Sequence, residues 1–201
     1  MIAIADYGMG NRRSVETALA HVGAESVITA DHAAIRAADA VILPGVGAFP
    51  EAVRNLRRTG LGDVLRELTQ PLLGICLGMQ LLFESSTEHE GAPGLGILPG
   101  TVTRLQAPRL PHIGWNLVGF ERESRIAEGL PDAAAFYHVH SFACRPSDPS
   151  DVVGVSEYGE RFVSVVERGH VMAVQFHPEK SSRDGLRMLR NFARLAAVAV
   201  A

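Results

Sequence analysis

Residues 72–83, with the sequence LLGICLGMQLLF, constrain the fold of this chain more than any other stretch. They begin as an apolar run short enough for a buried strand, pass through Gly74-x-Cys76-x-Gly78, and continue in a pattern typical of a helix. So sharp a strand-to-helix turn holds its central residue in a strained conformation and projects the side chain outwards. A helix N-terminus also stabilises a thiolate. Cys76 is therefore predicted to be a nucleophile if the chain supplies a base; otherwise it is a small core residue.

The segments before this turn alternate between apolar strands and amphipathic helices. Asn11 is expected to cap a helix that runs to about His21, Asp31 to open a short helix, and Pro50 to stand at the first position of a third. Another helix is expected after residue 60. Strands are predicted at residues 2–5, 26–29 and 40–43. This alternation predicts an α/β fold with an open, mostly parallel central sheet and helices on both faces.

The second half of the chain is predicted to be a smaller antiparallel or mixed portion. Residues 84–100 are polar and rich in glycine and proline, so we expect a surface loop there. Arg168-Gly169 predicts a hairpin turn, and Ser181 or Ser182 can cap a closing helix. Because no linker separates the two halves, residues 1–201 are expected to form a single domain. Short strands are expected at residues 101–105, 114–118, 134–139, 152–156, 162–166 and 171–176.

The composition argues against several classes of function. A formal net charge of −3 gives no support for nucleic-acid binding, and no apolar run has the length of a membrane span. The N-terminal residues lack the basic leader of a signal peptide, and the two cysteines, Cys76 and Cys144, form no disulfide framework. We therefore expect a cytoplasmic protein with no nucleic-acid or membrane partner.

A nucleophilic thiol needs a proton acceptor, and the chain has eight histidines. His112, His138 and His140 are an unusual set, since the last two share one face of an extended strand. A zinc site is conceivable there. However, no cysteine or carboxylate stands at ligand spacing beside these three, so neither a metal nor a cofactor is predicted. Solvated positions are expected for four others: His21, His32, His89 and His170.

The remaining histidine, His177, is the best candidate for the base. It ends the apolar run at residues 171–176 and precedes Pro178, which restricts it to an extended conformation. Glu179 stands two residues on, so both side chains can point the same way. A carboxylate beside an imidazole orients the ring, selects its tautomer and stabilises its protonated form. Cys76, His177 and Glu179 are therefore predicted to be nucleophile, base and orienting carboxylate.

Residues 44–47, with the sequence PGVG, follow the third predicted strand. Ligands of open α/β sheets bind at the carboxyl ends of the strands. The two glycines permit a backbone whose N–H groups turn towards a bound anion. Taken alone, the pattern favours an ordinary strand-to-helix loop.

Together, GICLGMQ at 74–80, PGVG at 44–47 and FHPEKS at 176–181 resemble the class I (triad) glutamine amidotransferases. Within that class, the chain resembles the glutaminase subunits of imidazole glycerol phosphate synthase, an enzyme of histidine biosynthesis. The residues that carry this second resemblance are DYGMGN at 6–11, PHIGWN at 111–116 and YHVHSF at 137–142. The resemblance covers essentially the whole chain and implies the flavodoxin-like fold of that class.

The resemblance also implies the reaction, a glutaminase step. Cys76 would attack the side-chain amide of L-glutamine, His177 would carry the proton, and Glu179 would orient His177. Water would then hydrolyse the glutamyl thioester. The oxyanion hole would be formed by the backbone around Val46, Gly47 and Leu77. Substrate binding would fall to Gly47, Gln80, Ser141 and Phe142.

A partner protein is implied as well. In this family the ammonia passes into a cyclase subunit of the same heterodimer, which makes imidazole glycerol phosphate and aminoimidazole carboxamide ribotide. Asn11 and Lys180 would face that subunit. Two residues depart from the family pattern: Phe142 replaces a frequent tyrosine, and His138 replaces a usual aromatic residue. For His138 we expect a surface or interface position.

Three competing interpretations stay open from the sequence. Another ammonia-donating glutaminase, such as that of pyridoxal phosphate synthase, has the same triad but needs neither residues 6–11 nor residues 111–116, whose Trp115 could simply fill the core. A stand-alone cysteine hydrolase on the same fold would need no partner. A silent binding module would have no use for an intact set of Cys76, His177 and Glu179.

Overall fold

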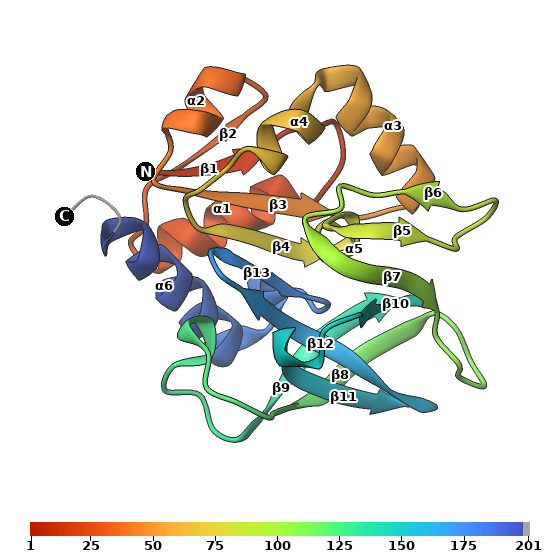
Figure 1. Ribbon diagram of the computed structural model, residues 1–201. Coiled ribbons are helices and arrows are strands. Elements are labelled where there is room, and N and C mark those ends of the chain that lie inside the picture. Colours follow the sequence, from red (N-terminus) through yellow and green to blue (C-terminus); the bar gives the residue numbers. More distant parts are fainter. Residues whose placement is uncertain (199–201) are drawn as a thin grey trace.

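Five parallel strands form one half of the sheet in the computed structural model, which describes residues 1–198 (Figure 1). Their spatial order, β2-β1-β3-β4-β13, is that of flavodoxin-like sheets. The predicted fold class is confirmed, and so are the predicted bounds of the first two strands. The five strands are β1 (Ile2–Ala5), β2 (Ser26–Thr29), β3 (Ala40–Gly45), β4 (Leu72–Cys76) and β13 (Val171–Val174).

The sheet continues beyond β13 through mainly antiparallel pairs, in the order β12-β10-β7-β5-β6. A side branch leaves β12 and runs through β11 and β8 to β9. These strands are β5 (Phe83–Ser86), β6 (Ala92–Pro93), β7 (Leu98–Arg104), β8 (His112–Phe120), β9 (Ala133–His140), β10 (Phe142–Pro146), β11 (Val152–Tyr158) and β12 (Glu160–Arg168).

The prediction of a surface loop at residues 84–100 is wrong. This segment holds most of β5, all of β6 and the start of β7, with β5 running parallel to β7. Pairing at the edge of a sheet rests on backbone hydrogen bonds, which a polar, glycine-rich sequence does not reveal. Strand β10 was not predicted for the same reason, because it forms through backbone pairing with β7 and β12, which do not adjoin it in sequence. The predicted hairpin between β12 and β13 is confirmed, but its turn is one residue later, at Gly169-His170, because Arg168 ends β12 and pairs with Val171.

Helices cover both faces of the parallel strands. One face carries α1 (Arg12–His21) and α6 (Ser182–Val198). The opposite face carries α2 (His32–Ala37), α3 (Phe49–Thr59), α4 (Leu61–Arg66) and α5 (Leu77–Leu81). None of the helices in residues 1–198 combines the length and apolar character that crossing a membrane requires. Within the described residues, the fold is completed by the 3-10 helices η1 (Arg125–Ala127), η2 (Pro149–Asp151) and η3 (Pro178–Lys180).

The predicted helix caps fare unequally. Asp31 caps α2 as expected, because its carboxylate accepts the Ala34 N–H at 2.7 Å. Asn11 stands at the N-cap position of α1, but its side chain makes no capping bond. Ser181 is not a side-chain cap either, since its hydroxyl donates to the backbone carbonyl of His177 at 2.6 Å. Both side chains instead form hydrogen bonds to residues of the site described below.

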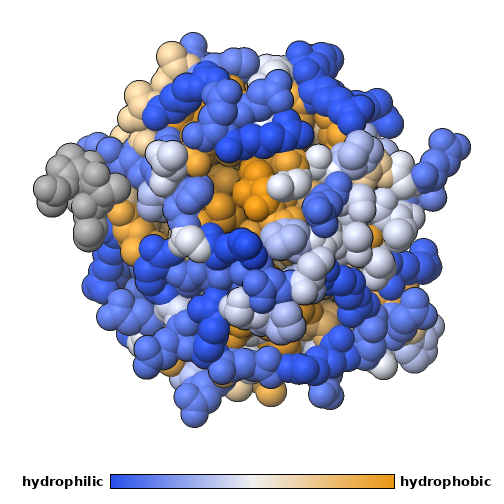
Figure 2. Space-filling view, viewed as in Figure 1, coloured by the Kyte–Doolittle hydropathy of each residue, from blue (hydrophilic) through white to orange (hydrophobic). Residues whose placement is uncertain are grey.

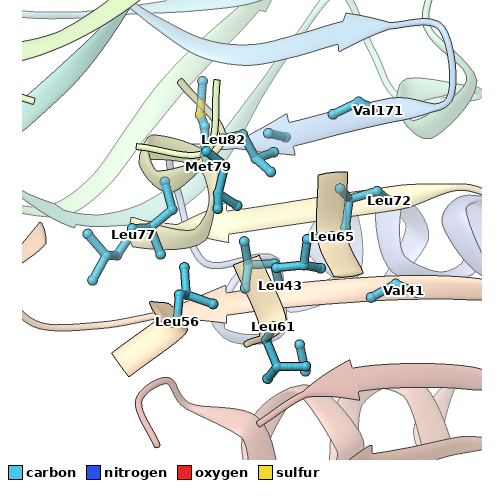
Figure 3. Close-up of a cluster of buried hydrophobic side chains, with 14 of the residues drawn as sticks. Val41, Leu43, Leu56, Leu61, Leu65, Leu72, Leu77, Met79, Leu82 and Val171 are labelled. Atoms are coloured by element: carbon cyan, nitrogen blue, oxygen red, sulfur yellow. The ribbon is translucent and has the colours of Figure 1, made fainter. Parts of the chain in front are cut away.

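The two faces of β3 enter two different cores, because successive strand residues point in opposite directions. Val41 and Leu43 pack with Leu56 and Leu61 of α3 and α4 (Figure 3). Ile42 belongs to the core beneath α1 and α6. Each buried side chain of this size contributes about 1.5–3 kcal/mol relative to an exposed position. Figure 2 shows that the outside of one face is largely hydrophilic, with apolar side chains visible mainly towards its middle.

The register of β3, β4 and β13 brings three distant segments together at one edge of the sheet. Gly45 pairs with Cys76 across the β3–β4 ladder, and Ile75 pairs with Val174 across the β4–β13 ladder. Because these strands are parallel, their carboxyl ends meet. The loop at residues 44–47, the Cys76 turn and the segment that leads to His177 therefore share this edge.

Close backbone packing fixes the Cys76 turn against β3. A Cβ atom on Gly78 would collide with the backbone carbonyl of Leu43, and one on Gly45 would lie 2.6 Å from the Gly78 nitrogen. Gly74 is equally confined, with the Met79 backbone 2.9 Å from the position of its Cβ. None of these three glycines has a positive φ. They are needed for close approach, and the strained conformation is borne by Cys76 itself.

We predict that Gly78→Ala destabilises the fold by about 2–3 kcal/mol, because the backbone of β3 must move to admit the methyl group. Gly119→Ala is the matched control, since its Cβ would meet nothing within 4 Å and its φ is not positive. It should change the stability by less than about 0.5 kcal/mol. Urea unfolding of both variants and the parent measures the difference, and equal stabilities would refute this explanation.

Candidate active site

Cys76 is held in a conformation that side chains rarely adopt, with φ 55° and ψ −112°. The predicted strain at this turn is confirmed. The expected exposure is not, since the residue is only 6% exposed. Its thiol points at the Val139 carbonyl, 3.8 Å away, and the Gln175 amide lies 3.9 Å from the sulfur. The helix that follows, α5, has only five residues, so its first-turn N–H groups matter more here than a macrodipole.

A cavity of about 310 Å³ opens over the thiol. Its volume suits a small polar substrate of amino-acid size. A larger hollow of about 740 Å³, bounded by residues 120–132 and Glu167, contains neither cysteine nor histidine and offers no comparable chemistry. The smaller cavity is lined by Val46, Gly47, Cys76, Leu77, Gln80, Glu88, Pro111, Val139, His140, Ser141, Phe142, His177 and Lys180.

His177 stands beside Cys76 and is fixed from several sides. Its Nδ1 lies 2.9 Å from the Glu179 carboxylate, and the side chains are only 3% and 1% exposed. Its backbone N–H donates to the Tyr137 carbonyl at 2.9 Å. The Asn11 amide donates to the same Glu179 oxygen at 3.3 Å. Because Nδ1 must donate to the carboxylate, Nε2 is the ring atom left to exchange a proton with the thiol.

The pKa of His177 is raised to about 10. Burial alone would lower this pKa, but the hydrogen bonds from the ring to Cys76 and Glu179 and the negative charge of both partners outweigh it. The second Glu179 oxygen has no hydrogen-bond partner within the described residues, which concentrates the carboxylate's interactions on His177 and Asn11. The arrangement therefore favours the protonated form of the His177 ring, held between Cys76 and Glu179.

The structure brings most of the predicted binding residues to one cavity. Gly47 has a positive φ of 102°, and Gln80 donates to the Phe142 carbonyl and to Gln175, each at 3.1 Å. Lys180 is exposed at the rim, whereas Asn11 lies behind the cavity against Glu179. The positions are thus established, and the roles of these residues in binding or stabilising a substrate stay predictions. The predicted residues along the wall are Val46, Gly47, Leu77, Gln80, Ser141, Phe142 and Lys180.

Sequence reasoning missed three polar residues around the site. Gln175 is fully buried between Gln80 and Cys76, and its signal was a polar side chain within the apolar run at residues 171–176. Tyr7 donates its buried hydroxyl to the Pro44 carbonyl at 2.9 Å, which supports the loop at residues 44–47. Glu88 accepts the Phe49 N–H at 2.8 Å, and no sequence signal marked it.

One expectation about an individual side chain is corrected, and one open alternative is excluded. His138, expected at a surface or interface, is fully buried, because the alternation along β9 turns it inwards together with His140. Trp115, for which packing in the core was an open alternative, is 55% exposed. It stands between two further exposed apolar residues of β8, Ile113 and Leu117.

Comparisons with known proteins agree with this geometry. The profile of the family "Glutamine amidotransferase class-I" matches residues 3–196. A protein of Bacillus cereus, "Imidazole glycerol phosphate synthase subunit HisH", is 50% identical over 197 residues, which are 96% of this chain and 93% of that protein. The protein of the same name from Aquifex aeolicus is 50% identical over 96% of both chains. A solved glutamine amidotransferase structure, 23% identical, covers 98% of this chain and is itself fully covered, with a TM-score of 0.77.

We predict that the His177 interactions make the fold less stable as the pH rises from about 7 to 9.5. The folded-state pKa is raised to about 10 from the ordinary 6.5, so this stabilisation is complete below pH 6.5 and fades towards pH 10. Between pH 7 and pH 9.5, the free energy of unfolding of the parent should fall by on the order of 2 kcal/mol more than that of His177→Gln.

Chemical denaturation at both pH values measures this difference. His21→Gln, a change at an exposed helix end, is the control and should follow the parent. A His177→Gln profile that parallels the parent profile would contradict the proposed ion pair.

Proposed function

The chain belongs to the class-I glutamine amidotransferase family, and from this premise we propose that it is the glutaminase subunit of an imidazole glycerol phosphate synthase. The observation that carries the chemistry is the buried His177–Glu179 pair beside the strained Cys76. About half of all residues are identical to those of two subunits of that synthase, which supports the proposal that the ammonia passes to a cyclase subunit.

In the proposed reaction, the Cys76 thiolate attacks the side-chain carbonyl carbon of L-glutamine. His177 gives its Nε2 proton to the departing nitrogen, so that ammonia leaves as the C–N bond breaks and a glutamyl thioester remains. A water molecule, deprotonated by His177, then cleaves the thioester to glutamate and restores the thiol. Glu179 keeps the ring oriented through both steps.

Charge develops on the glutamine carbonyl oxygen during each step and needs backbone donors. The N–H groups of Gly47 and Leu77 are proposed for this role, because both residues line the cavity beside the thiol. Val46, which precedes Gly47, is 40% exposed, so the peptide between them has room to turn. The glutamine itself is proposed to lie along Gln80, Ser141 and the Phe142 backbone.

The partner is proposed to be the cyclase subunit, and the apolar stripe on β8 is proposed to meet it. Ile113, Trp115 and Leu117 are 60%, 55% and 61% exposed and alternate along one face of the strand. Exposed apolar side chains gathered in this way are typical of interaction surfaces. Pro111, two residues before Ile113, lines the cavity, so the stripe begins at its mouth.

Two polar residues were also predicted to face the cyclase. Lys180 is exposed and lines the cavity, so it is retained in the proposed interface. Asn11 donates to Glu179, so its contact within the chain is with the orienting carboxylate. We therefore propose that Asn11 supports His177 indirectly, in addition to its predicted place in the interface.

Cys76→Ala should abolish glutamine-dependent synthesis by the complex with the cyclase and leave ammonia-dependent synthesis intact, because only the first reaction needs the thiol. Product formation is measured with glutamine and with an ammonium salt as the nitrogen source. Loss of both activities would show that Cys76 serves assembly or folding, and retention of both would exclude it as the nucleophile.

Trp115→Ser should weaken binding of the cyclase subunit at least about tenfold, because large aromatic side chains near the centre of an interface carry much of its energy. Calorimetric titration of one subunit into the other measures the affinity. Arg13→Ala on α1 is the control, since that side chain is 92% exposed and lies outside the β8 stripe. An unchanged affinity for Trp115→Ser would place the interface elsewhere.

A further inference from the structure

Three buried histidines, His112, His138 and His140, converge next to the active-site cavity from two neighbouring strands. In the antiparallel ladder between β8 and β9, which lie side by side in Figure 1, His112 pairs directly with His140 and Gly114 with His138. The three side chains are 3%, 0% and 6% exposed. One ring nitrogen from each lies within 4.8 Å of the other two. The glutaminase reaction, as proposed above, uses none of these rings.

Two of the three spacings between the ring nitrogens suit a tetrahedral metal ion. His140 Nε2 lies 3.2 Å from His112 Nδ1 and 3.3 Å from His138 Nδ1. Two nitrogens bound tetrahedrally to one zinc ion at about 2.0–2.1 Å are about 3.3–3.4 Å apart. The other nitrogen of His140, Nδ1, donates to the Phe142 carbonyl at 2.9 Å. A backbone carbonyl in this position is a typical second partner of a metal-binding histidine.

Without a cation the cluster cannot satisfy all of its nitrogens. The bond to Phe142 puts the proton of His140 on Nδ1 and leaves one lone pair on Nε2, which both neighbours approach. If His138 carries its proton on Nδ1, it competes with His112 for that lone pair. If its proton is on Nε2, two lone pairs face each other, and Nε2 has no partner within the described residues. Either form is costly in a buried site.

The surroundings favour neutral rings, the form that binds metals. Burial, followed by the charge of neighbouring histidines, lowers the pKa of His138 to about 2. Burial lowers the pKa of His140 to about 3, against the raising effect of its bond to Phe142. Access is available from the active-site side, because His140 lines the cavity above Cys76.

We propose that His112, His138 and His140 bind one divalent cation of the zinc type, which ties β8 to β9 beside the active-site cavity. Three protein nitrogens leave a fourth tetrahedral position for water. Binding requires His112 to hold its proton on Nε2, 3.4 Å from the Asn116 amide nitrogen. The amide must then rotate to present its oxygen, which gives up its bond to the Glu157 carbonyl. No metal was predicted from the sequence, because ligand spacing along the chain does not show that His112 lies beside the other two histidines. The register of the β8–β9 ladder brings His112 opposite His140.

The test uses the full chain in a Cys76→Ala background, so that the catalytic thiol cannot bind the metal. After removal of metals with a chelator, Co²⁺ is added as a spectroscopic substitute for zinc. We expect one equivalent to bind with the intense visible absorption of a tetrahedral site, and one equivalent of Zn²⁺ to displace it. His138→Phe should weaken binding about 100-fold or more, because it removes a ligand and keeps a ring of similar shape.

Controls separate this site from unspecific binding and from misfolding. His21→Gln should bind Co²⁺ as the background chain does, whereas His112→Gln should lose binding like His138→Phe. Zinc should raise the melting temperature of the background chain and leave that of both ligand variants unchanged, with circular dichroism confirming that each is folded. The proposal fails if no tetrahedral absorption develops, or if His138→Phe binds Co²⁺ as tightly as the background chain. Neither outcome depends on glutaminase activity.

Discussion

The contact on which the site depends is between two pieces of backbone, the end of β3 and the start of α5. Gly78 lies so close to Leu43 that no side chain fits between them, and Gly45 is confined in the same way from the other side. Because the two backbones pack so closely, the change of direction between β4 and α5 falls on Cys76, which adopts a strained φ of 55°. The sheet register then decides what surrounds the thiol, since parallel strands end together at this edge.

The same edge concentrates polar groups that water cannot reach. A buried carboxylate is costly unless its partners replace the lost hydration, and here His177 and Asn11 share that task. The backbone of His177 is in turn bound by Tyr137 and by the Ser181 hydroxyl. This explains why Asn11 and Ser181, which look like helix caps in the sequence, do not cap. Their side chains instead bond to Glu179 and to the backbone of His177, so the helix ends have no side-chain cap from them.

The predictable part of the structure is the part that local pattern determines. The bounds of β1 and β2, the Asp31 cap and the strained Cys76 follow from apolar runs, turn residues and glycine spacing. What sequence could not supply depends on pairing between distant strands. Residues 84–100 form strands through backbone bonds that composition does not encode, and the inward position of His138 follows from a ladder with a strand that begins 26 residues earlier, at His112.

Strand β9 is where the second half of the chain contacts Cys76 and His177, the candidate catalytic residues. Its Val139 carbonyl faces the Cys76 thiol, and its Tyr137 carbonyl accepts the His177 N–H. The neighbouring strand β8 carries the exposed stripe at one face and His112 at the other. If a partner binds that stripe as proposed, only β9 separates it from Cys76 and His177.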